Sequence, residues 1–306
     1  MTRPSRLRRS ELSTPASNER MIAKAAESDA DLVFLDLEDA VAPALKVPSR
    51  DNVVRGLREL DWGNKVRAVR VNSTDTQWAY EDVVQIVEAA GEHLDVIIIP
   101  KIKAPRDVWF FDTLLDELEQ KLGLEKQIGL EALVEETEAL ARVEEIAGCC
   151  PRLEALILGF GDFSASQGIR MGPISDPALR YPADLWSYHR NRLIGACKAA
   201  GIEAVDGPFA DFKDPEGYRR EASWSYQLGA SGKWAIHPSQ IALANEVFAP
   251  TEEEIAHART MVEAYERSAA GGEGAGAAGG VLVDAATVRI FQQVIDRAKQ
   301  IGLIDG

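Results

Sequence analysis

The feature that most constrains the fold is a repeated alternation of short apolar runs with longer amphipathic stretches. The runs at 33–35, 66–71 and 96–99 are short and rich in aliphatic residues, as expected of buried strands. The stretches between them carry apolar residues at helical spacing, so the pattern indicates parallel strands joined by helical crossovers. We count about seven repeats and place an eighth strand near Leu7–Leu12. This count predicts an α/β fold, a closed TIM (β/α)₈ barrel, which typically takes about 250 residues.

The C-terminal part of the chain departs from this pattern. Residues 271–280 read GGEGAGAAGG, a low-complexity run that we expect to be a flexible linker. A nucleotide-binding glycine loop is disfavoured because no strand precedes the run. The predicted organisation is a barrel catalytic domain at 1–250, a helix and Gly/Ala-rich linker at 251–280, and a small helical appendage at 281–306.

Charge and cysteine content exclude several classes of function. The 306-residue chain has a formal net charge of −15, which disfavours nucleic acids and anionic membranes as partners. No apolar run approaches the ~18 residues of a membrane span, and no signal-peptide core follows the N-terminal arginines. The chain has an odd number of cysteines, and two of the three are adjacent: Cys149, Cys150 and Cys197. This pattern does not indicate a set of disulfides, so we expect a reducing, cytoplasmic location.

Polar residues stand where the predicted strands end. In a parallel barrel these carboxyl ends lie on one face around one cavity, which carries the chemistry. A polar residue at a strand end can simply mark the start of a loop. Because polar residues follow most of the predicted strands at the same position, an active site is the favoured interpretation. The positions are Glu38, Asp39, Arg70, Asn72, Lys101, Glu135, Asp162, Asp206 and His237.

The composition of this ring predicts a hard metal ion. This ring has more carboxylates than cations: its cations are Arg70 and Lys101, and its carboxylates include Glu38, Asp39, Glu135 and Asp162. Carboxylates that converge repel one another unless a cation lies between them. Oxygen ligands select Mg²⁺, with Mn²⁺ as the alternative, over zinc. No serine or cysteine nucleophile signature competes. Lys101 suits a Schiff base or anion binding, and anion binding is favoured because an undesolvated lysine stays protonated.

Several segments resemble the HpcH/HpaI aldolase and citrate lyase family, most closely its malyl-CoA/β-methylmalyl-CoA lyase branch. The resemblance extends from about Ser10 to Ala298. It is carried by LDLEDAVAP at 35–43, RVN at 70–72, PK at 100–101, GFGDF at 159–163, VDGPF at 205–209, GKWAIHP at 232–238 and NEVF at 245–248.

The resemblance implies a TIM barrel with a mobile C-terminal helical lid at 281–306. Glu135 and Asp162 match the family's Mg²⁺ ligands, and Arg70 matches the arginine that binds the substrate's oxygens. Asp284 matches a lid aspartate that reaches a neighbouring subunit's site, which implies a homotrimer or homohexamer.

The resemblance also implies a CoA thioester as substrate. Thr14 and Pro15 fall where the family has a turn near CoA, and Lys24 matches a basic position. Asn18 replaces a family arginine, and Arg20, two residues later, is the candidate substitute. Further candidate substrate and CoA contacts are Arg70, Lys101, Gly161, Asp162, Ile236, His237 and Pro238.

Two local departures bear on the acyl group. Glu136 places an extra carboxylate next to the predicted ligand Glu135 unless it turns to solvent, and the segment 168–184 looks shorter than in the family.

The implied activity is a Mg²⁺-dependent, reversible cleavage of a β-hydroxyacyl-CoA such as (S)-malyl-CoA or β-methylmalyl-CoA. The products are glyoxylate, a 2-oxo acid, and acetyl-CoA or propionyl-CoA. Arg70 would stabilise the transition state, Asp284 would act as base in the condensing direction, and Glu38 and Asp39 would orient their neighbours.

Other activities remain open at this stage. They are a malyl-CoA thioesterase, a citramalyl-CoA or citryl thioester lyase like the citrate lyase β-subunit, a pyruvate-class aldolase without CoA, and a non-catalytic binding barrel.

Overall fold

The computed structural model describes residues 3–170, 184–272 and 274–305. The chain forms two compact units, Met1–Asn245 and Glu246–Gly306. Each unit has its own buried apolar side chains, such as Phe34 in the first and Met261 in the second. The boundary between the units falls five residues before the domain limit predicted at 250.

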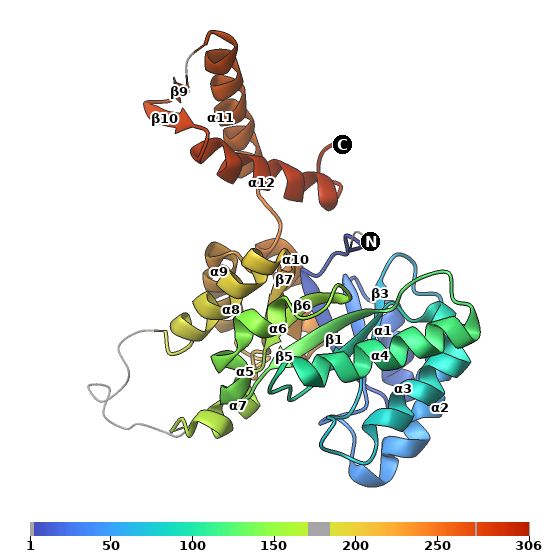
Figure 1. Cartoon of the computed structure of the whole chain (residues 1–306). Coiled ribbons are helices and arrows are strands. Elements are labelled where there is room, and N and C mark those ends of the chain that lie inside the picture. The colour runs from blue at the N-terminus through green and yellow to red at the C-terminus, as the bar shows by residue number, and fades with distance from the viewer. Residues whose placement is uncertain (1–2, 171–183, 273, 306) are drawn as a thin grey trace. The chain divides into compact units, whose positions relative to one another are not determined.

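Eight parallel strands close the first unit into a barrel, in the order in which they occur in the chain (Figure 1). Strand β1 pairs with β2 on one side and with β8 on the other, through Glu11↔Leu32 and Glu11↔Trp234. The predicted TIM barrel is therefore confirmed, although its first strand begins three residues later than expected. The strands are β1 Ser10–Pro15, β2 Leu32–Asp36, β3 Val66–Arg70, β4 Val96–Ile99, β5 Gly129–Val134, β6 Leu153–Leu158, β7 Glu203–Asp206 and β8 Gly232–Ala235.

Helices follow the strands and cover the barrel, and capping residues in the sequence mark where some of these helices begin and end. Asn18 caps α1 by accepting a hydrogen bond from the amide of Met21, and Gly123 ends α4 in the left-handed conformation. None of the helices in the described ranges is both long enough and apolar enough to cross a membrane. The helices of this part are α1 Glu19–Ala26, α2 Lys46–Glu59, α3 Ala79–Ala90, α4 Pro105–Leu122, α5 Thr137–Ala141, α6 Val143–Ala147, α7 Phe160–Gln167, α8 Ser187–Ala200 and α9 Pro215–Leu228. Helix α10 Ile241–Val247 contains the boundary between the two units.

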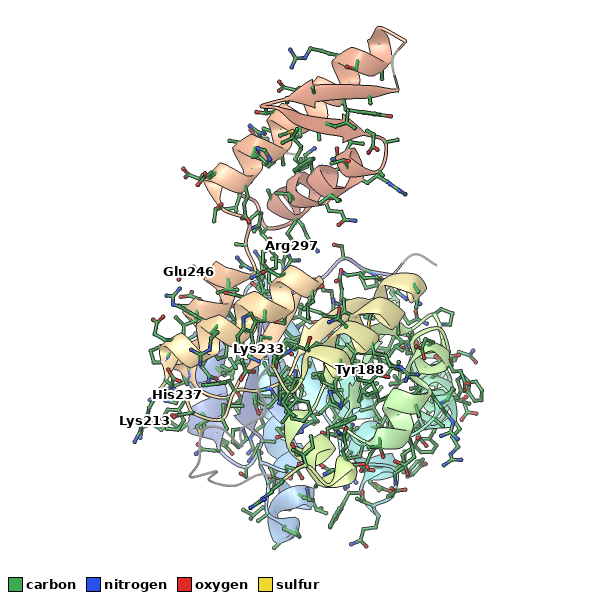
Figure 2. All side chains as sticks on the ribbon, turned by 90° about the vertical axis from the view of Figure 1, so that its left-hand side faces the viewer. Tyr188, Lys213, Lys233, His237, Glu246 and Arg297 are labelled. Atoms are coloured by element: carbon green, nitrogen blue, oxygen red, sulfur yellow. The ribbon has the colours of Figure 1, made fainter. Side chains whose placement is uncertain are left out.

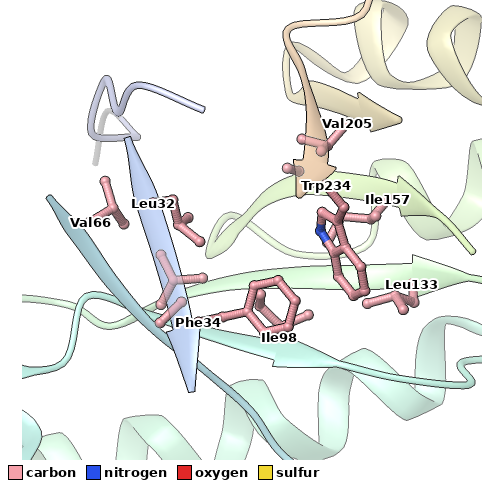
Figure 3. Packing of buried hydrophobic residues seen from close by; sticks show 11 residues of the cluster. Leu32, Phe34, Val66, Ile98, Leu133, Ile157, Val205 and Trp234 are labelled. Carbon is pink, nitrogen blue, oxygen red and sulfur yellow. The ribbon is translucent and has the colours of Figure 1, made fainter. Parts of the chain in front are cut away.

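The barrel interior is filled by side chains from alternate strand positions (Figure 3). Phe34 and Trp234 meet there with ring centroids 4.5 Å apart. Successive side chains of a strand point alternately into the barrel and out of it. The inward side chains of this layer are apolar, and polar inward side chains lie toward the two ends of the strands. The cluster comprises Leu32, Phe34, Val66, Ala68, Val96, Ile98, Leu133, Ala155, Ile157, Val205 and Trp234.

The second unit corrects the prediction of a flexible linker at 271–280. Within that run the structure has a strand, β9 Ala275–Ala278, paired antiparallel with β10 Val281–Asp284. Gly276 is buried, and a Cβ there would lie 2.7 Å from Ser268 Oγ and 2.8 Å from Ala264 O. Small residues thus let the strand pack closely on a helix, which composition alone does not reveal. The hairpin lies between α11 Glu252–Ala270 and α12 Thr287–Gln300 in the sequence.

Candidate active site at the carboxyl end of the barrel

The predicted strand-end residues converge at the carboxyl end of the barrel. The ammonium of Lys101, after β4, contacts Glu38, Asp39 at 3.2 Å and Asp162 at 3.3 Å. Its amide donates to Glu135 Oε1 at 2.8 Å. Residues that follow β2, β4, β5 and β6 are therefore joined into one polar cluster, as the sequence predicted.

Arg70 is fixed before any ligand arrives. Its Nε and Nη2 donate to the two oxygens of the fully buried Asp36, at 2.8 Å and 2.5 Å, and its Nη1 lies 3.2 Å from Glu38 Oε2. The guanidinium also lies 5.4 Å from the ring centroid of Trp234. Burial disfavours its charge, but the carboxylates of Asp36 and Glu38 outweigh burial and raise the pKa of Arg70. A permanently charged donor is therefore held in one orientation.

Glu38 and Asp39 differ in the charge that they can hold. Burial raises the pKa of Glu38 despite the charges of Arg70 and Lys101. Burial acts the same way on Asp39, but hydrogen bonds and the charge of Lys101 outweigh it and lower the pKa of Asp39. Asp39 is exposed, with 59% of its side-chain surface accessible, whereas the figure for Glu38 is 6%. Of the two, the buried Glu38 is therefore the one whose surroundings oppose its negative charge.

Glu135 is a buried carboxylate whose surroundings favour the protonated form. Burial is the main cause, the negative charges of Asp162 and Glu38 add to it, and together they raise its pKa to about 8 against the opposing charge of Arg70. The residue packs against Gly159, where a Cβ would lie only 2.5 Å from Glu135 Oε2. A divalent cation at this point would favour the ionised form and relieve the unfavourable burial.

Glu135 and Asp162 suit a magnesium ion in the number and type of their ligand atoms. Asp162 lies in the first turn of α7, and 39% of its side-chain surface is exposed. Among the described residues no group of three or more His, Cys, Asp or Glu side chains forms a metal site. Mg²⁺ needs only one or two carboxylates and completes its octahedron with water and substrate, whereas structural zinc needs a full protein shell.

Lys101 is the one non-glycine residue with positive φ among those described, at 52°. This left-handed conformation costs a residue with a side chain about 1–2 kcal/mol. It places the amide of Lys101 on Glu135 while the ammonium reaches Glu38, Asp39 and Asp162. Burial lowers the pKa of the ammonium, but the hydrogen bond and charge of Glu38 outweigh it and raise the pKa. A protonated lysine cannot form a Schiff base, which argues against the covalent alternative, and the ammonium pairs with carboxylates of the protein itself.

Sequence reasoning missed two residues that hold this site together. Asp36 orients Arg70, and its only sequence signal is a carboxylate inside the otherwise apolar run 32–37. Lys46, buried in the first turn of α2, donates to the carbonyl oxygens of Leu37 at 2.9 Å and Glu38 at 2.8 Å. Nothing in the sequence distinguishes Lys46 from an ordinary surface lysine of an amphipathic helix.

The predicted CoA contacts divide into two groups. Thr14 and Pro15 end strand β1, and a turn starts at Pro15, whose carbonyl accepts from the amide of Asn18 at 3.1 Å; of the two residues expected at a turn, Thr14 still belongs to the strand. The β-strand register with β2 continues to Pro15↔Asp36, which keeps these residues extended. In α1, Arg20 and Lys24 are exposed, as is the capping residue Asn18.

The second group follows β8. Ile236, His237 and Pro238 are exposed, and His237 (Figure 2) stacks on Phe212 with ring centroids 4.8 Å apart. Gly161 is exposed in the first turn of α7, and Glu136 is half-buried at the start of α5. Most of the segment 168–184, predicted to be shortened, lies outside the described residues.

Asp284 belongs to the second unit and ends strand β10. Its Oδ1 accepts hydrogen bonds from the amides of Ala286 at 3.0 Å and Thr287 at 2.8 Å, and from the Thr287 hydroxyl at 2.7 Å. The amide and hydroxyl of Thr287 lower the pKa of Asp284. The carboxylate is therefore ionised and half-buried, and it binds the amide of Thr287, the first residue of helix α12.

Comparison with known proteins gives a consistent set of relatives. The family model described as HpcH/HpaI aldolase/citrate lyase matches residues 9–238. The L-malyl-CoA/beta-methylmalyl-CoA lyase of Rhodobacter capsulatus is 41% identical over 305 residues, covering 97% of this chain and 96% of the relative. A (3S)-malyl-CoA thioesterase of Cereibacter sphaeroides is 33% identical over 293 residues, covering 96% of this chain and 95% of the relative.

Solved structures agree with the barrel. A citrate lyase from Burkholderia xenovorans superimposes with a TM-score of 0.83 at 25% identity, covering 96% of this chain and 92% of the other. The protein CitE from Mycobacterium tuberculosis, in complex with magnesium, acetoacetate and coenzyme A, gives 0.74 at 28% identity, covering 94% and 97%.

Proposed function

Because the chain belongs to the HpcH/HpaI aldolase/citrate lyase family, we propose that it is a carbon–carbon lyase acting on a β-hydroxyacyl-CoA. The proposed substrates are (S)-malyl-CoA and β-methylmalyl-CoA, cleaved reversibly to glyoxylate and acetyl-CoA or propionyl-CoA, as the name of the R. capsulatus relative suggests. The observation that carries the proposal is the convergence of Arg70, Glu135 and Asp162 at one strand-end cluster, with Lys101 bound to both carboxylates.

The proposed metal ligands are Glu135 and Asp162. Bound Mg²⁺, with Mn²⁺ as an alternative, would polarise the hydroxyl and carboxylate of the substrate. The presence of magnesium in the CitE structure supports this assignment. Arg70 would hold the oxygens on which negative charge develops, and its fixed orientation means that little reorganisation is needed during the reaction.

The bond changes in the cleavage direction define what the side chains must do. The β-hydroxyl loses its proton and becomes the aldehyde carbonyl of glyoxylate, while the electrons of the broken C–C bond form the thioester enolate. That enolate takes a proton to become acetyl-CoA. We assign both transfers to Asp284: its ionised carboxylate would accept the proton that the β-hydroxyl loses and deliver it to the enolate, and in the condensing direction it would take the proton from acetyl-CoA. Glu38 and Asp39 would orient Arg70 and Lys101.

Lys101 has a different proposed role from the one that its sequence position suggested. Three carboxylates already surround its ammonium, so it is better suited to neutralising them than to binding the CoA phosphates. Arg20, exposed in the first turn of α1, is the better candidate for the phosphates. Ile236, His237 and Pro238 would offer the adenine an exposed apolar and aromatic surface.

The first test uses the purified protein, (S)-malyl-CoA and Mg²⁺, with and without EDTA. Glyoxylate, acetyl-CoA and free thiol are followed together. Equal amounts of glyoxylate and acetyl-CoA, abolished by EDTA, would establish the lyase. Free CoA and malate without glyoxylate would instead establish a thioesterase, the alternative that the C. sphaeroides relative supports at lower identity. Turnover of citramalyl-CoA alone would move the assignment to a citramalyl-type lyase.

We further propose that the chain acts in the cytoplasm as a homotrimer or homohexamer in which Asp284 serves a neighbouring subunit. Subunit complementation tests this arrangement. Asp284→Ala is expected to be at least about 100-fold, and Asp162→Asn at least about 1,000-fold, less active than the wild type. Co-folded mixtures should regain a measurable part of the activity, because some sites then combine an intact Asp162 with an intact Asp284. Mixtures no more active than either variant alone would contradict sharing between subunits.

A further inference from the structure

A network of buried charges lies beside the proposed metal site without including its ligands. Arg190 of α8 donates to both oxygens of Asp206, at 2.9 Å and 3.2 Å, and Lys233 donates to Asp206 at 2.7 Å (Figure 2). The side chains of these three residues are at most 1% exposed. Glu221 joins the network by accepting from Arg190 at 2.8 Å. Burying so many charges is unfavourable unless they are fully paired, so their function calls for an explanation.

The two cations of the network meet on the ring of Phe160. The guanidinium of Arg190 lies 4.9 Å from the ring centroid, and the ammonium of Lys233 lies 5.3 Å from it. Trp186 packs on the same ring with a centroid separation of 4.8 Å. Cation–π contacts are strongest when the cation is desolvated, as both are here. The ring of Phe160 is therefore held on several sides.

The backbone around Phe160 is held from the β7 side as well. Lys233 donates to the carbonyl of Gly207 at 2.8 Å, which fixes the turn after β7. A Cβ on Gly207 would lie 2.0 Å from the carbonyl oxygen of Leu158 and 3.0 Å from the Phe160 ring. The turn thus lies directly against the segment that joins β6 to α7.

Phe160 belongs to a segment that contacts one proposed metal ligand and contains the other. The preceding residue, Gly159, lies against the carboxylate of Glu135, and Asp162 follows two residues later in the first turn of α7. The carbonyl of Phe160 accepts from the hydroxyl of Ser164 at 2.7 Å. A shift of Phe160 therefore changes the spacing between Glu135 and Asp162.

We propose that the Arg190–Asp206–Lys233 network is a positioning device for the metal site. By holding the ring of Phe160 it presets the separation of the carboxylates of Glu135 and Asp162 before the ion arrives. The inference rests on the proposed function, in which these two carboxylates bind Mg²⁺. Groups that orient metal ligands typically change metal affinity by about 10–100-fold when they are altered.

Arg152 provides a matched control. It is also a fully buried arginine, paired with Asp112 at 3.0 Å and Glu119 at 2.6 Å, but it precedes β6 at the amino end of the barrel. Arg→Lys at either position keeps the charge and removes the planar fork that pairs with carboxylates. Arg190→Lys and Arg152→Lys should therefore both lower the thermal stability, but only Arg190→Lys should weaken metal binding.

The experiment measures Mn²⁺ binding to the full chain by electron paramagnetic resonance of the free ion. Arg190→Lys is expected to bind Mn²⁺ about tenfold more weakly than the wild type, and Arg152→Lys within about twofold. Phe160→Leu keeps the bulk of the side chain and removes the ring; it should reproduce the loss and decide the matter if Arg190→Lys does not fold. Activity should show a raised activation constant for Mg²⁺ and a smaller change in kcat at saturating Mg²⁺.

Three results would overturn the inference. Equal losses in Arg190→Lys and Arg152→Lys would mean general destabilisation, and wild-type affinity in Phe160→Leu would show that the ring does not position the ligands. In both cases the metal site itself stands. A wild-type protein that binds no Mn²⁺ at millimolar concentration would instead remove the metal assignment and the positioning role together.

Discussion

The amino end of the barrel places Arg8 between Glu131 and Glu154, whereas the carboxyl end places Lys101 between Glu38 and Asp162. Both clusters contain more carboxylates than cations. They differ in their access to water. At the amino end Arg8, Glu11, Glu131 and Glu154 are at most 4% exposed, and Arg6, which also pairs with Glu154, is 16% exposed. At the carboxyl end Lys101 is 27% and Asp162 39% exposed.

In the sealed cluster, burial opposes the excess negative charge and favours the protonated form of the carboxyl groups. One oxygen of Glu11 and one of Glu131 have no hydrogen-bond partner, and burial raises the pKa of both groups. The open cluster has another option, because a metal ion or a substrate can enter. The same composition therefore serves structure at one end and, in our proposal, chemistry at the other.

The largest effect should follow Asp162→Asn at the open end. We expect kcat to fall at least about 1,000-fold, equivalent to roughly 4 kcal/mol of transition-state stabilisation. The free energy of unfolding should change by no more than about 0.5 kcal/mol, because the side chain is partly exposed. Steady-state kinetics in Mg²⁺ and urea denaturation measure the two quantities. Full activity in this variant would remove Asp162 from the metal site.

Arg8→Met at the sealed end should give the opposite result. It leaves Glu131 and Glu154 without their buried cation, and breaking a buried ion pair costs about 3–5 kcal/mol. The kcat of the protein that remains folded should match that of the wild type. If kcat falls together with the free energy of unfolding, the amino-end cluster affects catalysis as well as stability, and the contrast between the two ends is wrong.

Arg70→Lys should have an intermediate effect. Lysine keeps the charge but cannot make the paired hydrogen bonds to Asp36, so the donor loses its fixed orientation. We expect kcat to fall about 100-fold, with a smaller change in KM. A variant with wild-type kcat would show that charge alone is needed at this position.

The smallest effect concerns pH. The folded-state pKa of Glu135 is about 8, above its ordinary value of 4.5, so in the metal-free protein the folded state binds this proton more tightly. The resulting stability is fully present below about pH 4.5 and is lost as the pH rises through about 8. In EDTA the wild type should therefore lose stability over this window relative to Glu135→Gln.

Metal affinity should change in the opposite sense over the same window. Because Mn²⁺ must displace the proton of Glu135, its affinity should rise by up to about tenfold per pH unit until the pH passes the pKa. Isothermal titration at several pH values measures this slope. An affinity independent of pH between 6 and 8 would contradict the raised pKa.

The sequence revealed the barrel and the strand-end cluster because both depend on local order along the chain. A strand end is recognisable by where an apolar run stops, and parallel strands then bring Glu38, Lys101 and Glu135 together. The partners of those residues were not predictable. Asp36 pairs with Arg70 across two strands, 34 residues apart, and that pairing depends on barrel geometry.

Other failures have the same origin. Arg8 was read only as one of several N-terminal arginines, although it bonds to Glu131 and Glu154 inside the barrel. The glycine-rich run was read as a linker because its composition says nothing about the helix against which Gly276 packs. In each case the missing information is a contact between segments far apart in sequence.

The pairing of β1 with β8 has a consequence for how the molecule is made. Glu11 finds its neighbour Trp234 only after 223 further residues have been synthesised, and the indole of Trp234 then donates to Glu11 at 2.8 Å. Until that moment the first strand has an unpaired edge, which is a template for wrong association. The nascent chain therefore carries an aggregation hazard in its earliest segment until strand β8 has been made and can pair with it.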